Sequence, residues 1–234
     1  MKKICSGVLF FSIIMLFSQK MTFKSDIQII YNLEFKSDST RNIKNNEILG
    51  LYIGDKQSIF QAEKKYKLDS IIENQKVLIL PNRPMFRVNS VIFKDLKKSE
   101  VIFTEEVDKI VFGYEEPIQM KWELLNDKKT ILTYNCHNAR TSFRGRNYTV
   151  WYTKDIAIPD GPYKFAGLPG LILEVYDDQE NFHYKLLQII RRPQEILYNK
   201  AIHFTDRKKI IESKINYAQK NSKEVVHFNP IEKN

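Results

Sequence analysis

The chain has 234 residues, of which 43% are hydrophobic and 28% are charged, and its formal net charge is +9. This length fits one large domain or two small ones, and the hydrophobic share is enough for a packed core. Glycine and proline number only eight each, which excludes collagen-like and largely disordered chains. Phe and Tyr are abundant, which favours β-strands over a helical bundle.

Residues 1–19 have the layout of a secretory signal peptide. Two lysines precede an uncharged, mostly apolar stretch over residues 4–17. As a helix this stretch would rise about 21 Å, which is short of the ~30 Å hydrocarbon core of a membrane. We therefore expect export to the periplasm or the outer membrane, with cleavage near Ser18-Gln19. The alternative is an N-terminal anchor that remains uncut.

Removal of the signal peptide changes two properties of the chain. The charge falls from +9 to +7, because two lysines and no acids are lost. Cys136 then remains as the single cysteine, so no disulfide can form within one mature chain. We expect Cys136 to be buried, because free cysteine is among the most buried residue types.

Residues 20–234 read as a single, mainly β domain. Serial strands without regularly interleaved helices predict a curved antiparallel sheet or half-barrel. Residues 126–128 are expected to link two of the strands as a hairpin. Strands are predicted at residues 27–35, 48–53, 77–80, 87–93, 101–104, 110–114, 120–125, 130–136, 147–153, 171–176 and 182–190.

Two segments are predicted to be helical. Residues 58–72 form a short internal helix in which Phe60, Lys64 and Leu68 recur at four-residue steps. A C-terminal helix is expected to start after Thr205, which can cap it, and to end near residue 221.

Backbone geometry is most closely prescribed between residues 145 and 170, where four of the eight glycines and three of the eight prolines lie. Residues 168–171 (Leu-Pro-Gly-Leu) fit a type II β-turn, because proline presets φ and glycine accepts a positive φ. The apolar run at 171–173 predicts a strand that is buried on both faces, or a strand below a covering loop.

Motifs in this region resemble those of the GLPGLI family. Residues 167–172 read Gly-Leu-Pro-Gly-Leu-Ile, the hexapeptide for which that family is named. Elements similar to its F-R-G-R, W-Y-T and G-P-x-K-F motifs stand at 143–146, 151–153 and 161–165. The match covers about residues 120–177, with Thr133 in place of an expected glycine.

The resemblance implies an exported protein of Bacteroidetes-type bacteria, without an established activity and without catalytic residues. A fainter likeness to periplasmic lipoprotein carriers implies a curved sheet around an apolar cavity under a helix. The candidate ligand-binding or motif residues are Tyr134, Cys136, Arg144, Arg146, Trp151, Lys164, Gly167, Leu168, Pro169, Gly170 and Leu171.

Catalysis and metal binding find little support in the sequence. None of the four histidines has metal-ligand spacing with another, so we expect neither a metal nor a cofactor. Cys136 and His137 are neighbours and would face opposite sides of a strand. Asp177-Asp178 could bind a cation or could close a strand in a solvated turn.

Arg144 and Arg146 flank Gly145 and could together hold a carboxylate or a phosphate. The alternative is that they pair with internal acids such as Glu174. Trp151 could likewise face a ligand or pack in the core.

The basic residues form scattered doublets and one triplet, so no nucleic-acid partner is expected. They are compatible with peripheral contact with acidic envelope surfaces, which salt would weaken.

Three functions remain open. The leading hypothesis is a non-enzymatic envelope protein that binds or carries a lipid or peptide in an apolar concavity, with residues 161–170 as its rim or lid. The second is an accessory protein of a cell-surface or peptide-export system that acts through a protein interface with an envelope partner. The third is an unrecognised hydrolase that uses Cys136 or an acid pair.

Overall fold

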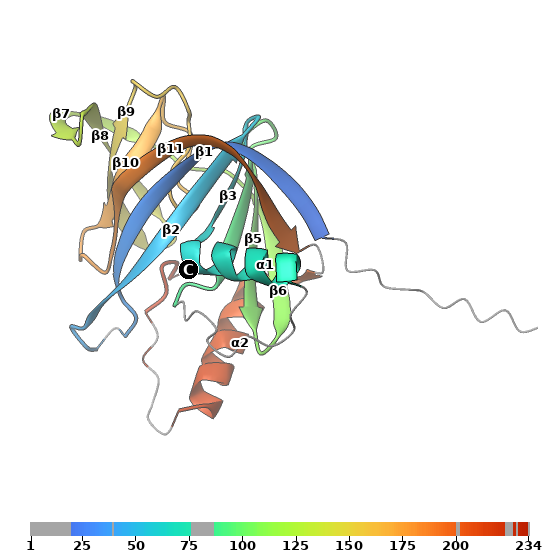
Figure 1. Ribbon diagram of the computed structural model, residues 1–234. Coiled ribbons are helices and arrows are strands. Elements are labelled where there is room, and N and C mark those ends of the chain that lie inside the picture. Colours follow the sequence, from blue (N-terminus) through green and yellow to red (C-terminus); the bar gives the residue numbers. More distant parts are fainter. Residues whose placement is uncertain are drawn as a thin grey trace, which may run out of the picture.

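The computed structural model describes residues 20–38, 40–75, 87–199, 202–222, 227 and 229–233 (Figure 1). The expected signal peptide and the expected strand at 77–80 lie outside these residues. In the described part of the chain, twelve strands form one sheet with the order β12-β6-β5-β4-β3-β2-β1-β11-β10-β9-β8-β7. Neighbouring strands are antiparallel, except that β12 runs parallel to β6.

The sheet is accompanied by two helices and stays open, with β7 and β12 at its edges. This architecture confirms the expected mainly β fold with a curved antiparallel sheet, a short internal helix and a C-terminal helix. The elements are β1 (Lys20–Lys36), β2 (Lys44–Gly54), β3 (Gln57–Ala62), α1 (Glu63–Gln75), β4 (Ser90–Asp95), β5 (Glu100–Val107), β6 (Ile110–Pro117), β7 (Glu123–Ile131), β8 (Tyr134–Phe143), β9 (Arg146–Thr153), β10 (Leu171–Asp177), β11 (Phe182–Asn199), β12 (His203–Phe204) and α2 (Arg207–Lys220).

The two longest strands, β1 and β11, pair with each other and form the arch seen in Figure 1. Two register shifts interrupt their pairing, and irregularities of this kind bend strands. β2 pairs only with residues 27–36 of β1. The remaining ends, residues 20–25 and 194–199, therefore continue as a two-stranded ribbon.

Hydrophobic side chains cover both faces of the sheet. The larger cluster draws on nearly every strand and includes Ile29, Tyr31 and Leu33 of β1. We call this face the inner face. The members of a smaller cluster alternate along β2 and β3 with those of the larger one, so they lie on the opposite, outer face. The smaller cluster consists of Phe23, Tyr52, Ile59 and Ile196.

The ribbon and α1 lie against the outer face. Phe23 packs edge-on against Phe93 of β4 with 6.4 Å between ring centroids, and Tyr198 of β11 stacks on Phe93 at 5.9 Å. Tyr66 of α1 lies 5.2 Å from Tyr52 of β2, measured between ring centroids. The outer face therefore has two walls, one formed by α1 and one by the ribbon.

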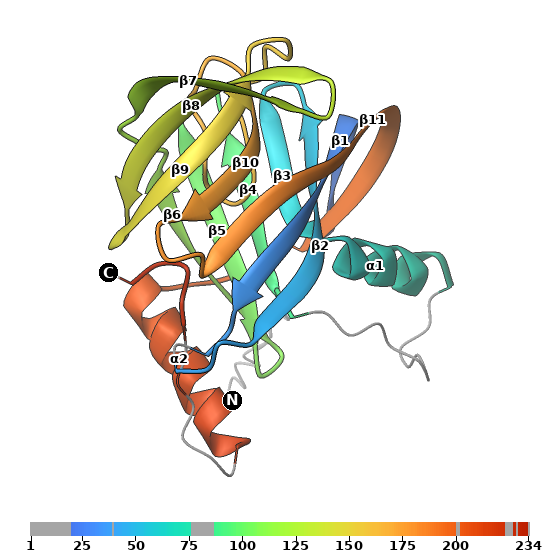
Figure 2. The same ribbon diagram turned by 90° about the vertical axis from the view of Figure 1, so that its left-hand side faces the viewer.

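The inner face is filled by the loop at residues 154–170. β8–β10 face β4–β6 across this side (Figure 2), and Phe165 and Leu168 of the loop belong to the inner cluster. Lys94 of β4 donates to the main-chain oxygen of Gly161 at 2.6 Å. The loop is therefore part of the core rather than a lid over a cavity.

The predicted start of the internal helix at residue 58 is wrong. Residues 57–62 pair with β2 as β3, and α1 begins at Glu63. Ile59 and Phe60 are both buried, one on each face of the sheet. Burial on both faces favours a strand and outweighs the weak helical periodicity.

The predicted helix cap and the predicted hairpin link also differ from the structure. Asp206, and not Thr205, caps α2, and its side chain accepts from the main-chain N–H of Lys209 at 3.0 Å. Residues 126–128 lie inside β7, where the pairing with β8 is irregular. The chain turns instead after β7, at residues 132–133.

The predicted type II turn at 168–171 is wrong as well. The main-chain N–H of Leu171 donates to Ile156 rather than back to Leu168, and the N–H of Gly170 donates to Leu168 at 2.8 Å. The expected burial of residues 171–173 is confirmed, because all three are inaccessible to solvent.

Candidate functional site

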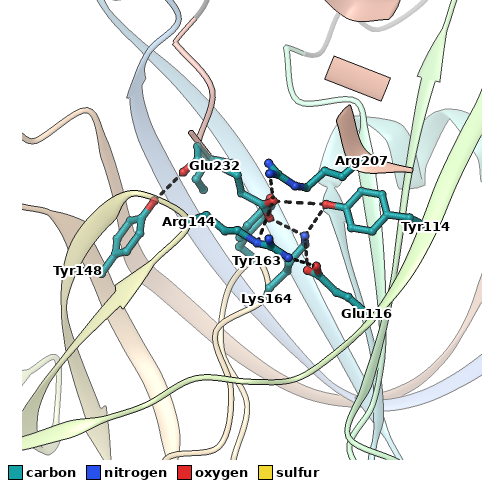
Figure 3. Close-up of polar contacts among 9 residues, drawn as sticks. Tyr114, Glu116, Arg144, Tyr148, Tyr163, Lys164, Arg207 and Glu232 are labelled. Atoms are coloured by element: carbon teal, nitrogen blue, oxygen red, sulfur yellow. Dashed lines mark hydrogen bonds and ion pairs between the residues drawn. The ribbon is translucent and has the colours of Figure 1, made fainter. Parts of the chain in front are cut away.

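Lys164, a residue selected from the sequence, lies at the centre of a buried polar cluster on the inner face (Figure 3). Its Nζ donates to the hydroxyl of Tyr114 and to Glu116 Oε1 at 2.6 Å each, and to Glu232 Oε1 at 2.5 Å. The side chain is only 2% exposed. A buried lysine needs such partners, because an unpaired buried charge is costly.

Glu232 gathers further partners from distant parts of the chain. Tyr163 donates to it at 2.6 Å, and the guanidinium groups of Arg207 and Arg144 lie 3.5 Å and 3.8 Å away (Figure 3). Burial, together with the charge of Glu232, raises the pKa of Tyr163 well above its ordinary value. The cluster therefore ties α2 and the β8–β9 turn to the loop that holds Lys164.

The segment at residues 229–233 lies along this surface like a strap. Arg146 donates to the side-chain oxygen of Asn229 at 2.6 Å. Tyr148 donates to the main-chain oxygen of Ile231 at 2.9 Å (Figure 3). The motif residues around 144–148 thus bind a segment of the same chain.

Both predicted arginines pair with internal acids. Arg144 lies 2.5 Å from Glu116, and Arg146 lies 3.1 Å from Asp177. Glu174, the acid named from the sequence, contacts neither arginine; it binds Lys129 and His183 instead. The Arg146 side chain is 2% exposed, whereas Arg144 is partly open to solvent.

Trp151, Tyr134 and Cys136 lie on β8 and β9. Trp151 is buried, with Lys129 Nζ 4.3 Å above its ring centroid, and Tyr134 packs half-buried against the inner cluster. The expected burial of Cys136 is confirmed at 1% exposure. Burial raises the pKa of its thiol, which lowers the thiolate fraction needed for nucleophilic catalysis. The geometry therefore gives no support to a hydrolase built on Cys136.

The predicted turn residues connect the loop to β10, and they differ in their exposure to solvent. Leu168 and Leu171 are buried in the inner cluster, while Gly167 and Pro169 are exposed. At Gly170 a Cβ atom would lie only 2.0 Å from a main-chain oxygen of β9. Glycine is therefore required there by the close approach of two backbones.

The apolar cavity expected beside residues 161–170 is found elsewhere. It lies on the outer face, has a volume of about 450 Å³, and is bounded by α1, the floor of β3–β6 and the ribbon end of β11. Its apolar floor includes Ile59, Val91, Phe93 and Ile102. The loop fills much of the inner face, where a hollow beside Phe103, Tyr114 and Tyr163 has a volume of only about 70 Å³. The volume of the outer cavity is typical of small-ligand sites.

The rim of the outer cavity is polar and acidic. Its acids are Asp69 of α1, Glu105 and Glu106 of β5, and Glu115 of β6, with Lys65 as the accompanying base. Lys65 pairs with Asp69 at 2.8 Å. Lys214 of α2 lies 2.6 Å from Glu105.

Gln61 lines the same cavity and is 1% exposed. Its Nε2 has no hydrogen-bond partner among the described residues. A buried donor without an acceptor costs about 1–3 kcal/mol, which an acceptor on a bound ligand would recover. The cavity therefore offers a hydrogen-bond donor beside its apolar floor.

Sequence reasoning selected no residue of this cavity. The floor is formed by residues on the outer face of strands whose alternate residues belong to the inner core. An apolar run in the sequence therefore does not show which face of the sheet borders a cavity. The acids Glu105, Glu106 and Glu115 interrupt the apolar pattern of β5 and β6. They are the one sequence signal that could have indicated a polar rim.

The described ranges contain neither a metal-binding cluster nor a membrane-spanning helix. There, no three His, Cys, Asp or Glu side chains are grouped as a metal ion would require. No helix in these ranges has the length and apolar character needed to cross a membrane.

A protein-family model matches most of the chain. The model described as "N-glycanase peptide, N-terminal domain" matches residues 29–207, well over half of the chain. This finding contradicts the resemblance to the GLPGLI family. The assignment to a Bacteroidetes-type family, which rested on that resemblance, is therefore wrong as well. The short motifs misled because their glycines and prolines meet local backbone needs, such as the close approach at Gly170, that are not specific to one family.

Two solved structures share the fold of this chain. Two structures of PNGF-II, in space groups C2 and P21, have TM-scores of 0.55 and 0.54 and share 17% sequence identity with the chain. They cover 80% and 81% of this chain but only 32% and 33% of their own. The chain thus spans about a third of the length of these structures.

One further solved structure is only weakly similar to the chain. A LolA superfamily protein from Nitrosomonas europaea has a TM-score of 0.25 and 7% identity, over 75% of this chain and 79% of its own. No curated protein matches the sequence.

Proposed function

Since the chain belongs to the N-glycanase peptide, N-terminal domain family, we propose that it is a non-catalytic module that binds an apolar peptide segment for an N-glycanase. The family description contains the words "N-glycanase peptide", and a peptide is the ligand class of this proposal. Export to the cell envelope, expected from residues 1–19, is part of this proposal.

The observation that carries the proposal is the outer cavity of about 450 Å³. Apolar side chains from β3, β4 and β5 form its floor, and the ribbon end of β11 adds Leu197 and Tyr198. Burial of apolar ligand surface against such a floor contributes roughly 25 cal/mol per Å² before the costs of binding. A short apolar peptide segment is therefore a suitable occupant.

A peptide is favoured over a lipid by the unpartnered amide of Gln61. Each residue of an extended peptide carries a main-chain carbonyl that can accept from this donor. The acyl chain of a lipid has no acceptor along its length. A role as an accessory protein, the second hypothesis from the sequence, is compatible with a module that holds substrate for a separate active site.

The test uses the neutral apolar fluorophore N-phenyl-1-naphthylamine. Val91→Trp should fill the cavity and weaken probe binding by about tenfold, because the probe and the new ring compete for one space. The matched control is Leu124→Trp, which changes an exposed residue of β7 and should leave probe binding unchanged. Circular dichroism checks that both variants are folded.

Displacement of the probe identifies the occupant. An apolar peptide should displace it from the wild-type chain, and phospholipid should not. Equal probe binding by both tryptophan variants, or displacement by phospholipid alone, would overturn the proposal.

A further inference from the structure

We propose that the outer cavity selects peptides in which the apolar segment is flanked by lysine or arginine. This inference rests on the proposed function of the same cavity and specifies its ligand. It combines two features of the cavity, an acidic rim and a buried hydrogen-bond donor without a partner.

The charge at the rim is opposite to that of the whole molecule. The chain carries +9, so its long-range field repels cations. The polar rim of the cavity nevertheless contains four acids and one lysine. A cationic ligand that binds here must therefore be attracted by the local acids rather than by the overall charge.

Two of the four acids remain available to a ligand. Asp69 and Glu105 have the lysine partners described above. Within the described residues, Glu106 and Glu115 have no ion pair with a lysine, arginine or histidine. Glu115 is exposed and Glu106 is half-buried, so a flexible cationic side chain can reach both carboxylates from solvent.

Gln61 supplies the second contact. Gln61 of β3 lines the cavity and its buried amide Nε2 has no partner among the described residues, while Glu106 and Glu115 lie on β5 and β6. A peptide laid across these strands would place a main-chain carbonyl against Gln61 and its apolar side chains on the floor. The flanking base would then meet the acids at the rim. Apolar surface, acceptor and positive charge together describe a peptide with an apolar core and a basic flank.

The experiment compares two labelled peptides by fluorescence anisotropy with the full chain. Both peptides share one apolar core; one ends in lysine and the other ends in glutamate. The lysine peptide should bind roughly tenfold more tightly at low salt, and added salt should reduce this preference. The double variant Glu106→Gln/Glu115→Gln should abolish the preference, whereas Glu123→Gln, an exposed acid of β7, should retain it.

Gln61→Leu tests the carbonyl contact. It should weaken the binding of both peptides several-fold, because the peptide carbonyl then loses its donor. Equal affinity for the two peptides, or a preference that survives in the double variant, would overturn the inference on charge. The proposed function would still hold in that case if both peptides displaced the probe, and it would fail if neither did.

Discussion

Buried charges fix the segments of this protein that have no regular structure. Lys94 of β4 pairs with Asp160, and both side chains are fully buried. Burial lowers the pKa of Lys94, and the charge of Asp160 acts against this shift. The pair anchors the 154–170 loop to the sheet. Removal of one partner from such a pair costs about 3–5 kcal/mol, because the other charge stays buried.

Glu174 provides a pH-dependent contribution to stability. Burial acts to raise its pKa, but hydrogen bonds from His183 and Lys129 outweigh burial, and the pKa lies below its ordinary value of 4.5. A carboxyl with a lowered folded-state pKa stabilises the protein above its unfolded-state pKa. This stabilisation is lost as the pH falls through the folded-state value.

We predict that Glu174→Gln lowers the free energy of unfolding by about 2 kcal/mol at pH 7. The difference from the wild type should shrink as the pH falls below 4.5, where the wild-type carboxyl takes up its proton. Urea unfolding at several pH values measures this. Glu180→Gln, at an exposed ion pair, is the control and should cost at most about 1 kcal/mol at any pH. A Glu174→Gln deficit that is independent of pH would contradict the prediction.

At the scale of elements, polar contacts to two other segments hold the strap at 229–233. It contacts β9 through Arg146 and Tyr148, and the 161–165 loop through Lys164. Hydrogen bonds and ion pairs, rather than strand pairing, therefore hold it on the inner face. This explains why the F-R-G-R and G-P-x-K-F motifs lie side by side in the fold although they are separate in the sequence.

We predict that Glu232→Gln lowers the free energy of unfolding by about 3 kcal/mol, because Lys164 and Arg207 then lose a buried counter-charge. Hydrogen exchange should also accelerate at the main-chain amide of Lys233, which donates to Arg144. Glu212→Gln, at an exposed position of α2, should change neither quantity. Unaltered exchange at Lys233 would show that Glu232 does not hold the strap.

At the scale of the whole molecule, one inner cluster joins both halves of the sheet. It includes Phe103 of β5 and Tyr114 of β6 on one side, and Tyr148 and Val150 of β9 on the other. The loop residue Tyr163 packs against Phe103 with 6.5 Å between ring centroids. We therefore expect residues 20–234 to unfold as a single domain.

The two tryptophans and the two helices can test this cooperativity. Trp151 lies on β9, and Trp122 donates to the loop residue Ala166 at 2.9 Å, so both report on the β7–β10 half. The helices α1 and α2 contact β2, β3, β5, β6 and β11. Tryptophan fluorescence and circular dichroism at the helix wavelength should give the same urea midpoint. Two separate midpoints would show that the halves unfold independently.

Much of the fold was predictable from local pattern. Alternation in 27–35 and the apolar run at 171–173 indicate strands because side chains of a strand point to opposite faces. Element ends were less predictable. At 57–62 the pairing with β2 decides between strand and helix, and at 132–133 the turn is set by the register of β7 against β8. Both pairings join consecutive strands, but their registers depend on more residues than a short window of sequence contains.

The candidate site shows the same division. The sequence by itself determined that Arg144, Arg146 and Lys164 stand at backbone positions under tight constraint. The tertiary structure alone decided that they pair with the chain's own acids and strap, because burial requires each charge to find its counter-charge wherever the fold brings one. It also decided that the loop fills the inner face and that the apolar concavity lies on the outer face. Side chains on the two faces alternate along the same strands but pack against different neighbours, which only the folded chain brings together.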